Sequence, residues 1–306
     1  MATWLAGCAM PAGDLLAPDA SAAPPPRPVE AARTDPVSEA LASYFRNIQD
    51  QQLGQGLLRL DESALPPALD EARLSDVYVE IALRDEYRRD GGRFRASGES
   101  APLRRWASPV AYRLEFGDSV PAGTRQRDRA EVTRLVRDLA DTTGHPLRLL
   151  PEGSTTGANF HVLVLSEGER RAIGPRLRTL VPGIDDPTVD LITSLPRTAN
   201  CLVVAFAGRG QQVYTNAIAV IRTELPDLTR VACYHEELAQ GLGLPNDSPV
   251  ARPSIFNDAQ EYARLTRLDR LLLRLHYDER LRPGMREEEA RPIIREIAAE
   301  LLAAAG

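Results

Sequence analysis

The sequence contains no lysine, so all 37 of its basic residues are arginine. Its 43 acidic residues outnumber them and give a net charge of -6, which argues against nucleic acid as a partner, because nucleic-acid-binding proteins concentrate positive charge. No apolar run approaches the ~20 residues that a transmembrane helix requires. With 43% hydrophobic and 26% charged residues, the composition is that of an ordinary globular protein.

Histidine is also scarce, with four residues in the chain. A zinc-peptidase helix carries two histidines four residues apart, and no two of the four here have that spacing. One of them, His161, lies within an apolar run and is expected to be structural. This scarcity excludes a zinc centre built from paired imidazoles. The four histidines are His145, His161, His235 and His276.

The most informative stretch covers residues 233–247, with the sequence Cys-Tyr-His-Glu-Glu-Leu-Ala-Gln-Gly-Leu-Gly-Leu-Pro-Asn-Asp. We predict a helix over residues 228–242, whose first turn Asp227 or Thr229 can cap. Gly243 stands where helices commonly end in a left-handed turn. The segment beyond this glycine can then fold back toward the helix.

Glu236 and Gln240 are four residues apart, so they share one face of this helix, with Glu237 beside them. The pattern is similar to the zinc-binding helix of metzincin peptidases, His-Glu-x-x-His-x-x-Gly-x-x-His. Glu236, Gln240 and Asn246 stand at the three histidine positions. Glu237 stands at the general base and Gly243 at the glycine. The resemblance implies a peptidase scaffold that kept its base and lost all three imidazole ligands.

The second half of the chain resembles an uncharacterised bacterial envelope family, domain of unknown function 2927. This resemblance implies a zincin-like fold and often a lipoprotein, and it implies no activity. Residues 254–256 sit where metzincins carry a turn whose methionine underlies the metal, and Phe256 departs from that pattern. The segments that carry the likeness are residues 233–247, 253–258, 265–269 and 277–285, with a looser likeness over residues 73–199.

Leu5-Ala6-Gly7-Cys8 resembles the cleavage box of bacterial lipoproteins, in which the cysteine is acylated. A signal peptide also needs a basic start and an apolar core of ~7–15 residues, and neither is present. Either the true start lies upstream, or the match is accidental and residues 9–34 are a disordered cytoplasmic tail. In the first case this alanine- and proline-rich stretch is a tether, and a lipid on Cys8 anchors the protein to the membrane on the periplasmic side.

The remaining two cysteines form an even pair if Cys8 carries lipid. Cys201 opens an apolar run and Cys233 lies in the first turns of the predicted motif helix. An oxidising envelope would let them form a disulfide that pins this helix to the sheet. The alternative is a pair of buried free thiols in a reducing compartment.

Apolar runs and helical spacing predict the other elements. A helix begins at Asp35-Pro36, and residues 74–88 fit a helix and a strand equally well. Residues 185–190 read as an acidic, solvated loop. The expected strands cover residues 110–116, 147–150, 160–165, 201–206 and 213–221. The expected helices cover residues 127–142, 167–177, 265–277 and 287–304.

We also make predictions for several individual residues. In the first helix an apolar stripe that begins at Val37 is expected to be buried. Gly91-Gly92 marks a turn. Asp269 is expected to make a capping or surface contact, and His276 is expected to interact with the carboxyl-end dipole of its helix.

These elements together predict an α+β, zincin-like fold with a mixed sheet, the motif helix and a C-terminal helical subdomain. An unpaired sheet edge near the motif helix would let a peptide add itself as an extra strand, and a strand paired on both sides fits the sequence equally well. The expected divisions are a signal remnant and tether over residues 1–35, an accessory segment over 36–105, the zincin-like domain over 106–285 and a terminal helix over 286–306.

Zinc is not expected at the motif, because the amide oxygens of Gln240 and Asn246 suit it poorly. Together with Glu236 and Asp247, these residues offer only oxygen, which is the chemistry of calcium, magnesium or manganese. With such an ion, Glu237 would be the general base. Without an ion, a lone carboxylate does not hydrolyse peptides.

Three functions therefore remain open. The first is a non-catalytic envelope protein that binds a peptide or protein partner. The second is a metal-dependent peptidase or hydrolase that uses an oxygen-ligated ion and Glu237. The third is a purely structural envelope domain, in which the motif side chains only hydrogen-bond the loop over residues 246–258.

Overall fold

The structure, a computed structural model, describes residues 35–90, 93–208, 210–257 and 259–305. These residues cluster as one unit. The expectations for Cys8, for the tether over residues 9–34 and for the Gly91-Gly92 turn lie outside the described residues.

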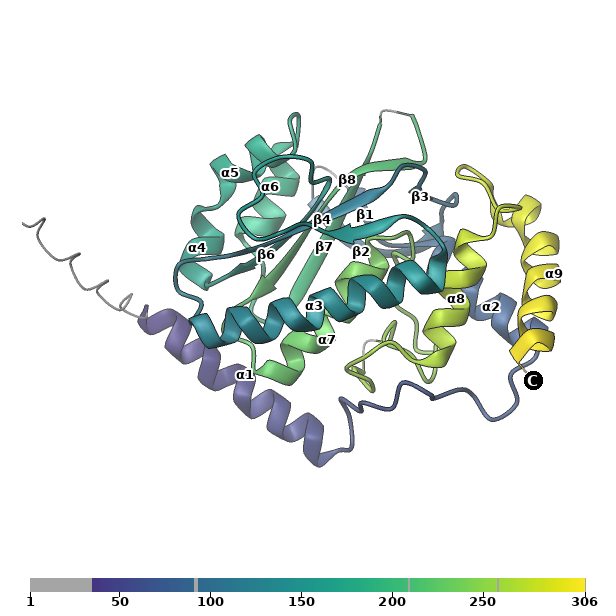
Figure 1. The fold of residues 1–306 in the computed structure, drawn as a ribbon, viewed down its shortest axis with the longest axis horizontal. Coiled ribbons are helices and arrows are strands. Elements are labelled where there is room, and N and C mark those ends of the chain that lie inside the picture. The colour runs from purple at the N-terminus through teal and green to yellow at the C-terminus, as the bar shows by residue number, and fades with distance from the viewer. Residues whose placement is uncertain (1–34, 91–92, 209, 258, 306) are drawn as a thin grey trace, which may run out of the picture. The chain divides into compact units, whose positions relative to one another are not determined.

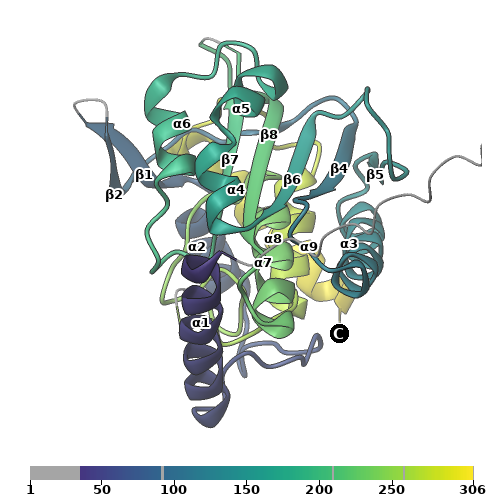
Figure 2. The same ribbon diagram turned by 90° about the vertical axis from the view of Figure 1, so that its left-hand side faces the viewer.

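A six-stranded mixed sheet forms the centre of the fold. Five strands run parallel in the order β3-β8-β6-β4-β5, and β7 pairs antiparallel with β8 on the other side. Figure 2 shows β7 at one edge of the sheet and β5 at the other. The strands are β3 Arg105–Trp106, β4 Val110–Phe116, β5 Leu147–Leu149, β6 Phe160–Leu165, β7 Cys201–Ala207 and β8 Val213–Arg222.

Helices cover both faces of this sheet (Figure 1). Val162 and Val164 of β6 belong to the larger core, which includes residues of α3 (Ala122–Thr143) and α7 (Asp227–Gln240). Leu163 and Leu165 of β6 point to the opposite face, against the smaller helices. These helices are α4 Glu167–Ala172, α5 Gly174–Leu180 and α6 Asp186–Thr193. The expected combination of helices with a mixed sheet is confirmed, and the fold is mixed α/β with a largely parallel sheet.

The predicted first helix is α1, Pro36–Gly54, and the Asp35 side chain accepts a hydrogen bond from the Val37 N–H at its start. Phe45 is buried as expected, whereas Val37 is 50% exposed, so the stripe prediction was wrong at its first position. The ambiguous segment after α1 contains both structures. It folds as α2, Glu71–Ala82, followed by β1, Arg84–Asp90, which pairs with β2, Arg93–Ser100, in a separate hairpin.

Residues 185–190 do not form the predicted loop but begin α6. Asp185 is the N-cap, and its side chain accepts from the Thr188 N–H at 3.0 Å. A carboxylate at this position satisfies an amide that the first helical turn leaves without a partner. The predicted 167–177 helix is divided into α4 and α5.

The two C-terminal helices are α8, Arg267–Tyr277, and α9, Glu287–Ala305, and α9 packs on α2. Asp269 makes the predicted capping contact through a reciprocal capping box with Thr266, and it is fully buried. Among the described residues, no helix is both long enough and apolar enough to cross a bilayer.

The prediction for His276 was wrong, because the imidazole is buried and neutral. Burial, with a smaller contribution from nearby Arg105, lowers its pKa to about 3. Its Nε2–H donates to the Arg104 carbonyl at 3.1 Å, so its Nδ1 accepts from the Tyr78 hydroxyl at 2.9 Å. The cation at the end of α8 is Arg105, whose guanidinium donates to the carbonyl oxygens of His276 and Asp278.

Candidate functional site

The site is built on α7, Asp227–Gln240, which begins five residues after β8 ends at Arg222. Cys233, Glu236, Glu237 and Gln240 follow the spacing i, i+3, i+4 and i+7, so they lie along one face of the helix. Cys233 is bonded to the first residue of β7, so this face is turned toward β7. The helix therefore presents two carboxylates and an amide to the edge strand of the sheet.

The side of α7 that faces α3 is held by a buried ionic cluster. The Arg230 guanidinium donates to both oxygens of Asp128, at 2.9 and 3.0 Å. The Tyr234 hydroxyl donates to the same carboxylate at 2.9 Å. All three residues are buried. Bidentate pairing of this kind fixes geometry, so the cluster sets the rotation of α7 and hence the direction of its Glu236 and Glu237 side chains.

His235 belongs to this supporting side and not to the site. Its Nδ1 accepts from the Leu265 N–H at 3.1 Å, so its Nε2–H donates to Glu131 at 3.0 Å. Burial lowers the pKa of His235, although the hydrogen bond to Glu131 opposes the shift. His235 is therefore a neutral structural histidine.

The front of α7 is tied to the sheet by a disulfide between Cys201 and Cys233. Cys201 is the first residue of β7, and Cys233 lies in the middle of α7. The predicted pairing is confirmed. The bond fixes the distance between the edge strand and the helix face that carries the carboxylates.

The first turn of α7 is capped in a way that the sequence did not predict. The N-cap residue is Pro226, which has no side-chain hydrogen bond to the helix, so the prediction of Asp227 or Thr229 as the cap was wrong. Instead, the Gln49 side chain of α1 accepts from the Thr229 N–H at 3.1 Å and from its hydroxyl at 2.9 Å. A residue of α1 thus supplies the hydrogen-bond acceptor at the start of α7.

The end of α7 depends on two glycines. The helix ends at Gln240, two residues earlier than predicted, and Gly243 has the expected positive φ, +127°. A Cβ on Gly243 would lie 2.3 Å from the Arg104 carbonyl oxygen, and a Cβ on Gly241 would lie 2.5 Å from the Phe160 ring. Only glycine lets the chain turn this close to Phe160 of the sheet and to the Arg104 carbonyl.

Beyond this turn the chain runs back along α7, and the two predicted oxygen donors separate. The Gln240 amide donates to Asp247 at 3.0 Å, so Asp247 lies at the helix face with Glu237. The side-chain amide of Asn246 donates instead to the Glu80 carbonyl of α2 at 2.7 Å. Its backbone N–H bonds the Ile81 carbonyl. The structure therefore brings Glu236, Glu237, Gln240 and Asp247 to one pocket and turns Asn246 to α2.

This pocket has a volume of about 230 Å³ and lies between α7, the start of β7 and α6. It adjoins a second hollow of about 180 Å³ that continues along β7 to Ala205. The two share five lining residues: Glu86, Leu191, Leu202, Val203 and Gln240. We call the two together the edge groove. The first hollow is lined by Glu86, Leu191, Leu195, Pro196, Ala199, Cys201, Leu202, Val203, Glu236, Glu237, Gln240 and Asp247.

The Glu237 carboxyl is the most perturbed group of the groove. It is 4% exposed, and its Oε2 has no hydrogen-bond partner. Burial raises its pKa well above the usual range of a glutamate, and the carboxylates of Glu86 and Asp247 raise it further. The folded environment therefore favours the protonated form of Glu237.

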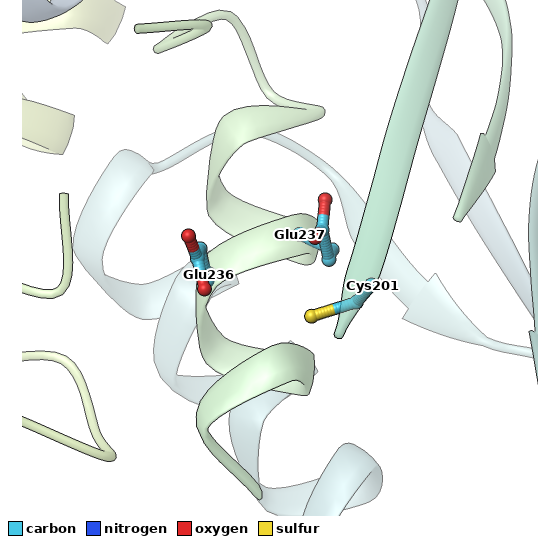
Figure 3. Close-up of side chains that lie close together, drawn as sticks. All are labelled: Cys201, Glu236 and Glu237. Atoms are coloured by element: carbon cyan, nitrogen blue, oxygen red, sulfur yellow. The ribbon is translucent and has the colours of Figure 1, made fainter. Parts of the chain in front are cut away.

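Figure 3 shows Glu236 and Glu237 on α7 with the Cys201 sulfur pointing toward that helix. One ligand atom from each of these three residues lies within 4.8 Å of the other two. It is the one such group of histidine, cysteine and acidic residues in the described part of the chain. In the disulfide the Cys201 sulfur is not a thiolate, which is the form that binds metals. The oxidised protein therefore offers two carboxylates here.

Sequence reasoning missed Glu86, which β1 brings to the groove from 150 positions before Glu236. It also missed the apolar wall that Leu191 and Leu195 supply from the region of α6. The predicted oxygen-ligated ion at Glu236, Gln240, Asn246 and Asp247 stays a prediction.

Comparison with known proteins gives one assignment. A family model described as Protein of unknown function (DUF2927) matches residues 71–296, as the sequence resemblance predicts. The match runs from the start of α2 into α9 and includes every residue of the edge groove. The comparison with curated proteins finds no match.

Proposed function

The chain belongs to the DUF2927 family, and from its site we propose that it binds a partner polypeptide, in extended conformation, along the outer edge of β7. In this proposal the protein is a non-catalytic cell-envelope protein. Its scaffold is of the zincin type and its motif is a degenerate metzincin motif.

The exposed side of β7 is the observation that carries the proposal. Within the described residues, β7 pairs with β8 alone, over Cys201 to Ala207. An edge strand presents N–H and C=O groups to which another chain can add by β-augmentation. The edge groove follows this side of β7 for five residues, from Cys201 to Ala205.

The groove is shaped for a strand rather than for a compact ligand. Consecutive residues Cys201, Leu202 and Val203 all line it, although neighbouring side chains of a strand point to opposite faces. A hollow that touches both faces must lie over the strand's edge. An added strand would lie beside a hollow that residues of both α6 and α7 line.

The degenerate motif supports a binding role over a catalytic one. Gln240 and Asp247 are hydrogen-bonded to each other, and the Asn246 amide is bonded to α2. These contacts give two of the three ligand positions of the metzincin pattern a structural role. The sequence strand, helix and glycine turn, from β8 to Gly243, supports the zincin assignment of the scaffold.

An envelope location is part of the proposal. The disulfide between Cys201 and Cys233 is of the kind that persists in oxidising compartments such as the bacterial periplasm. Anchoring through a lipid on Cys8 is the matching proposal for residues outside those that the structure describes.

The proposal is tested by selecting random heptapeptides on phage against the purified, oxidised protein. A selected peptide is then titrated against Leu191→Arg, which places a long charged side chain in the groove. The matched control is Leu60→Arg, because Leu60 is 51% exposed and lies outside the groove. We expect Leu191→Arg to weaken binding by about tenfold or more and Leu60→Arg to leave it unchanged. Failure to select any peptide, or equal binding by both variants, would contradict the proposal.

A hydrolase remains the second candidate because of Glu237. A buried glutamate with a raised pKa is typical of acid–base residues in active sites. This function predicts peptide hydrolysis that requires added calcium, magnesium or manganese and is lost in Glu237→Gln. Hydrolysis that survives this substitution would reject the role of Glu237.

A further inference from the structure

The groove is chemically uneven along β7. Among the residues that the structure describes, its first hollow, at the Cys201 end, is lined by four acidic side chains. The second hollow contains Arg104, which forms an ion pair with Asp85 at 2.6 Å. A strand bound along β7 therefore meets acidic side chains at one end and a paired arginine at the other. The four acidic residues are Glu86, Glu236, Glu237 and Asp247.

In the first hollow, which we call the acidic hollow, one buried carboxylate oxygen lacks a hydrogen-bond donor. Glu237 Oε2 is the single carboxylate oxygen of the first hollow that is buried without a hydrogen-bond partner. Buried polar atoms in folded proteins are nearly always paired, so such an exception points to a missing partner. A donor supplied by a ligand would satisfy this oxygen. A cationic donor would also stabilise the ionised form of Glu237 beside Glu86 and Asp247.

The remaining walls of the hollow are apolar. Leu191, Leu195 and Pro196 line one side, and Leu202 and Val203 line the strand side. A ligand that fits must combine a long aliphatic portion with a cationic end. Lysine and arginine side chains have this form, because their methylene stems pack on apolar surface while their heads bind polar groups.

A bare divalent ion fits the hollow less well. Ligand oxygens lie 2.0–2.6 Å from such an ion, so its carboxylates must lie within about 5 Å of one another. Among the described residues, the one group of three that meets this limit needs the Cys201 sulfur, which the disulfide occupies. The four acids therefore surround a wider space than an ion fills.

We propose that the acidic hollow binds an arginine or lysine side chain of the polypeptide that pairs with β7, with Glu237 and Asp247 receiving the cationic head and Leu191 and Leu195 contacting its stem. This inference rests on the proposed function, and it makes the partner a basic segment in extended conformation. The second hollow, in which Arg104 is paired with Asp85, then receives a neutral residue of the bound polypeptide.

The test uses amidated peptides, Ser-Thr-Val-Xaa-Val-Thr-Ser, labelled with fluorescein at the N-terminus. Xaa is arginine, lysine, citrulline or glutamate. Citrulline has the shape of arginine without its charge. We expect the arginine and lysine peptides to bind on the order of tenfold or more tightly than the citrulline peptide, and the glutamate peptide to bind most weakly.

Three protein variants locate the effect. Glu237→Gln and Asp247→Asn should each reduce the arginine-to-citrulline ratio to about threefold or less. The control Glu288→Gln, an exposed glutamate at the start of α9, should leave the ratio unchanged. Thermal unfolding of each variant verifies that it is folded, and the two groove variants give independent readings.

The outcomes separate the two proposals. Equal binding of arginine and citrulline peptides overturns the basic-residue proposal and leaves strand binding intact. The absence of binding by all four peptides, together with a failed phage selection, overturns both. Micromolar binding of calcium, magnesium or manganese that Glu237→Gln abolishes would assign the hollow to an ion and overturn the basic-residue proposal.

Discussion

At the Glu237 carboxyl, burial and the neighbouring carboxylates of Glu86 and Asp247 all raise the pKa. The folded protein holds the proton more tightly than the unfolded chain, because the pKa of Glu237 is raised above its ordinary value of 4.5. Between pH 4.5 and the raised pKa, the folded state therefore binds more protons. Stability falls as the pH rises through this interval.

Substitution of this carboxyl should therefore stabilise the free protein at neutral pH. We expect Glu237→Gln to raise the free energy of unfolding at pH 7.5 by about 1–3 kcal/mol, the range for an uncompensated buried polar group. At pH 4 the two proteins should differ by less than about 0.5 kcal/mol. Urea unfolding at both values of pH measures the difference.

Glu288→Gln, at an exposed position, serves as the control. Its free energy of unfolding should equal that of the unsubstituted protein at both values of pH. If the free energy of unfolding of Glu237→Gln depended on pH in the same way as that of the unsubstituted protein, the pKa of Glu237 would not be raised by folding. A gain in stability from losing a site residue is typical of positions shaped for binding.

At the scale of elements, α7 is fixed from both sides. The Asp128 cluster holds it on α3, and the disulfide holds it on β7. The two cysteines are separated by 32 residues, so the bond closes a loop that includes β8 and the connection between the two strands. Closing such a loop restricts the unfolded chain.

We expect the double substitution Cys201→Ser with Cys233→Ser to lower the free energy of unfolding by about 3–4 kcal/mol. Chemical reduction of the original protein should lower the melting temperature by the same amount as the double substitution. Reduction should leave the double variant unchanged. A reduced protein as stable as the oxidised one would contradict this account.

The elements that the sequence predicted correctly share a physical cause. The strands β4 and β6 match the prediction to the residue. In β6 the apolar residues run almost without interruption, which is typical of buried parallel strands. The error at α6 arose from counting acidic residues as solvated, although an N-cap aspartate followed by proline in the first turn is a helix-start pattern. The segment over residues 74–88 was ambiguous because a helix and a strand meet within it.

At the scale of the whole molecule, the N-terminal helix α1 is part of the site's support. Gln49 of α1 supplies the acceptor for the first turn of α7. Ser38 of α1 also donates to Glu224 at 2.7 Å, in the connection before α7. The segment from Thr34 to the C-terminus accordingly clusters as one unit.

Removal of the Gln49 side chain, which caps the first turn of α7, should be measurable as a loss of stability. We expect Gln49→Ala to lower the free energy of unfolding by about 0.5–2 kcal/mol, as removal of a helix cap does. Gln51→Ala, at an exposed position on the same helix, should change it by less than about 0.5 kcal/mol. Equal effects of the two substitutions in chemical unfolding would refute the capping role.

The candidate site could be predicted from the sequence only where its residues are close along the chain. The spacing within α7 placed Glu236, Glu237 and Gln240 together, and the cysteine count suggested the disulfide. Glu86 and Gln49 reach the site through tertiary packing, and no local pattern marks them. Asn246 was misplaced for the same reason, because its partner is a carbonyl of α2.

Amide hydrogen exchange with and without the arginine heptapeptide tests the central claim most directly. The account predicts slower exchange, when the peptide is bound, for those amides of β7, Cys201–Ala207, that do not donate to β8, because the added strand accepts their hydrogen bonds. The strand β5, Leu147–Leu149, lies at the other edge of the same sheet and should be unaffected. Bound peptide with no protection of β7, or with protection of β5 instead, would contradict the account.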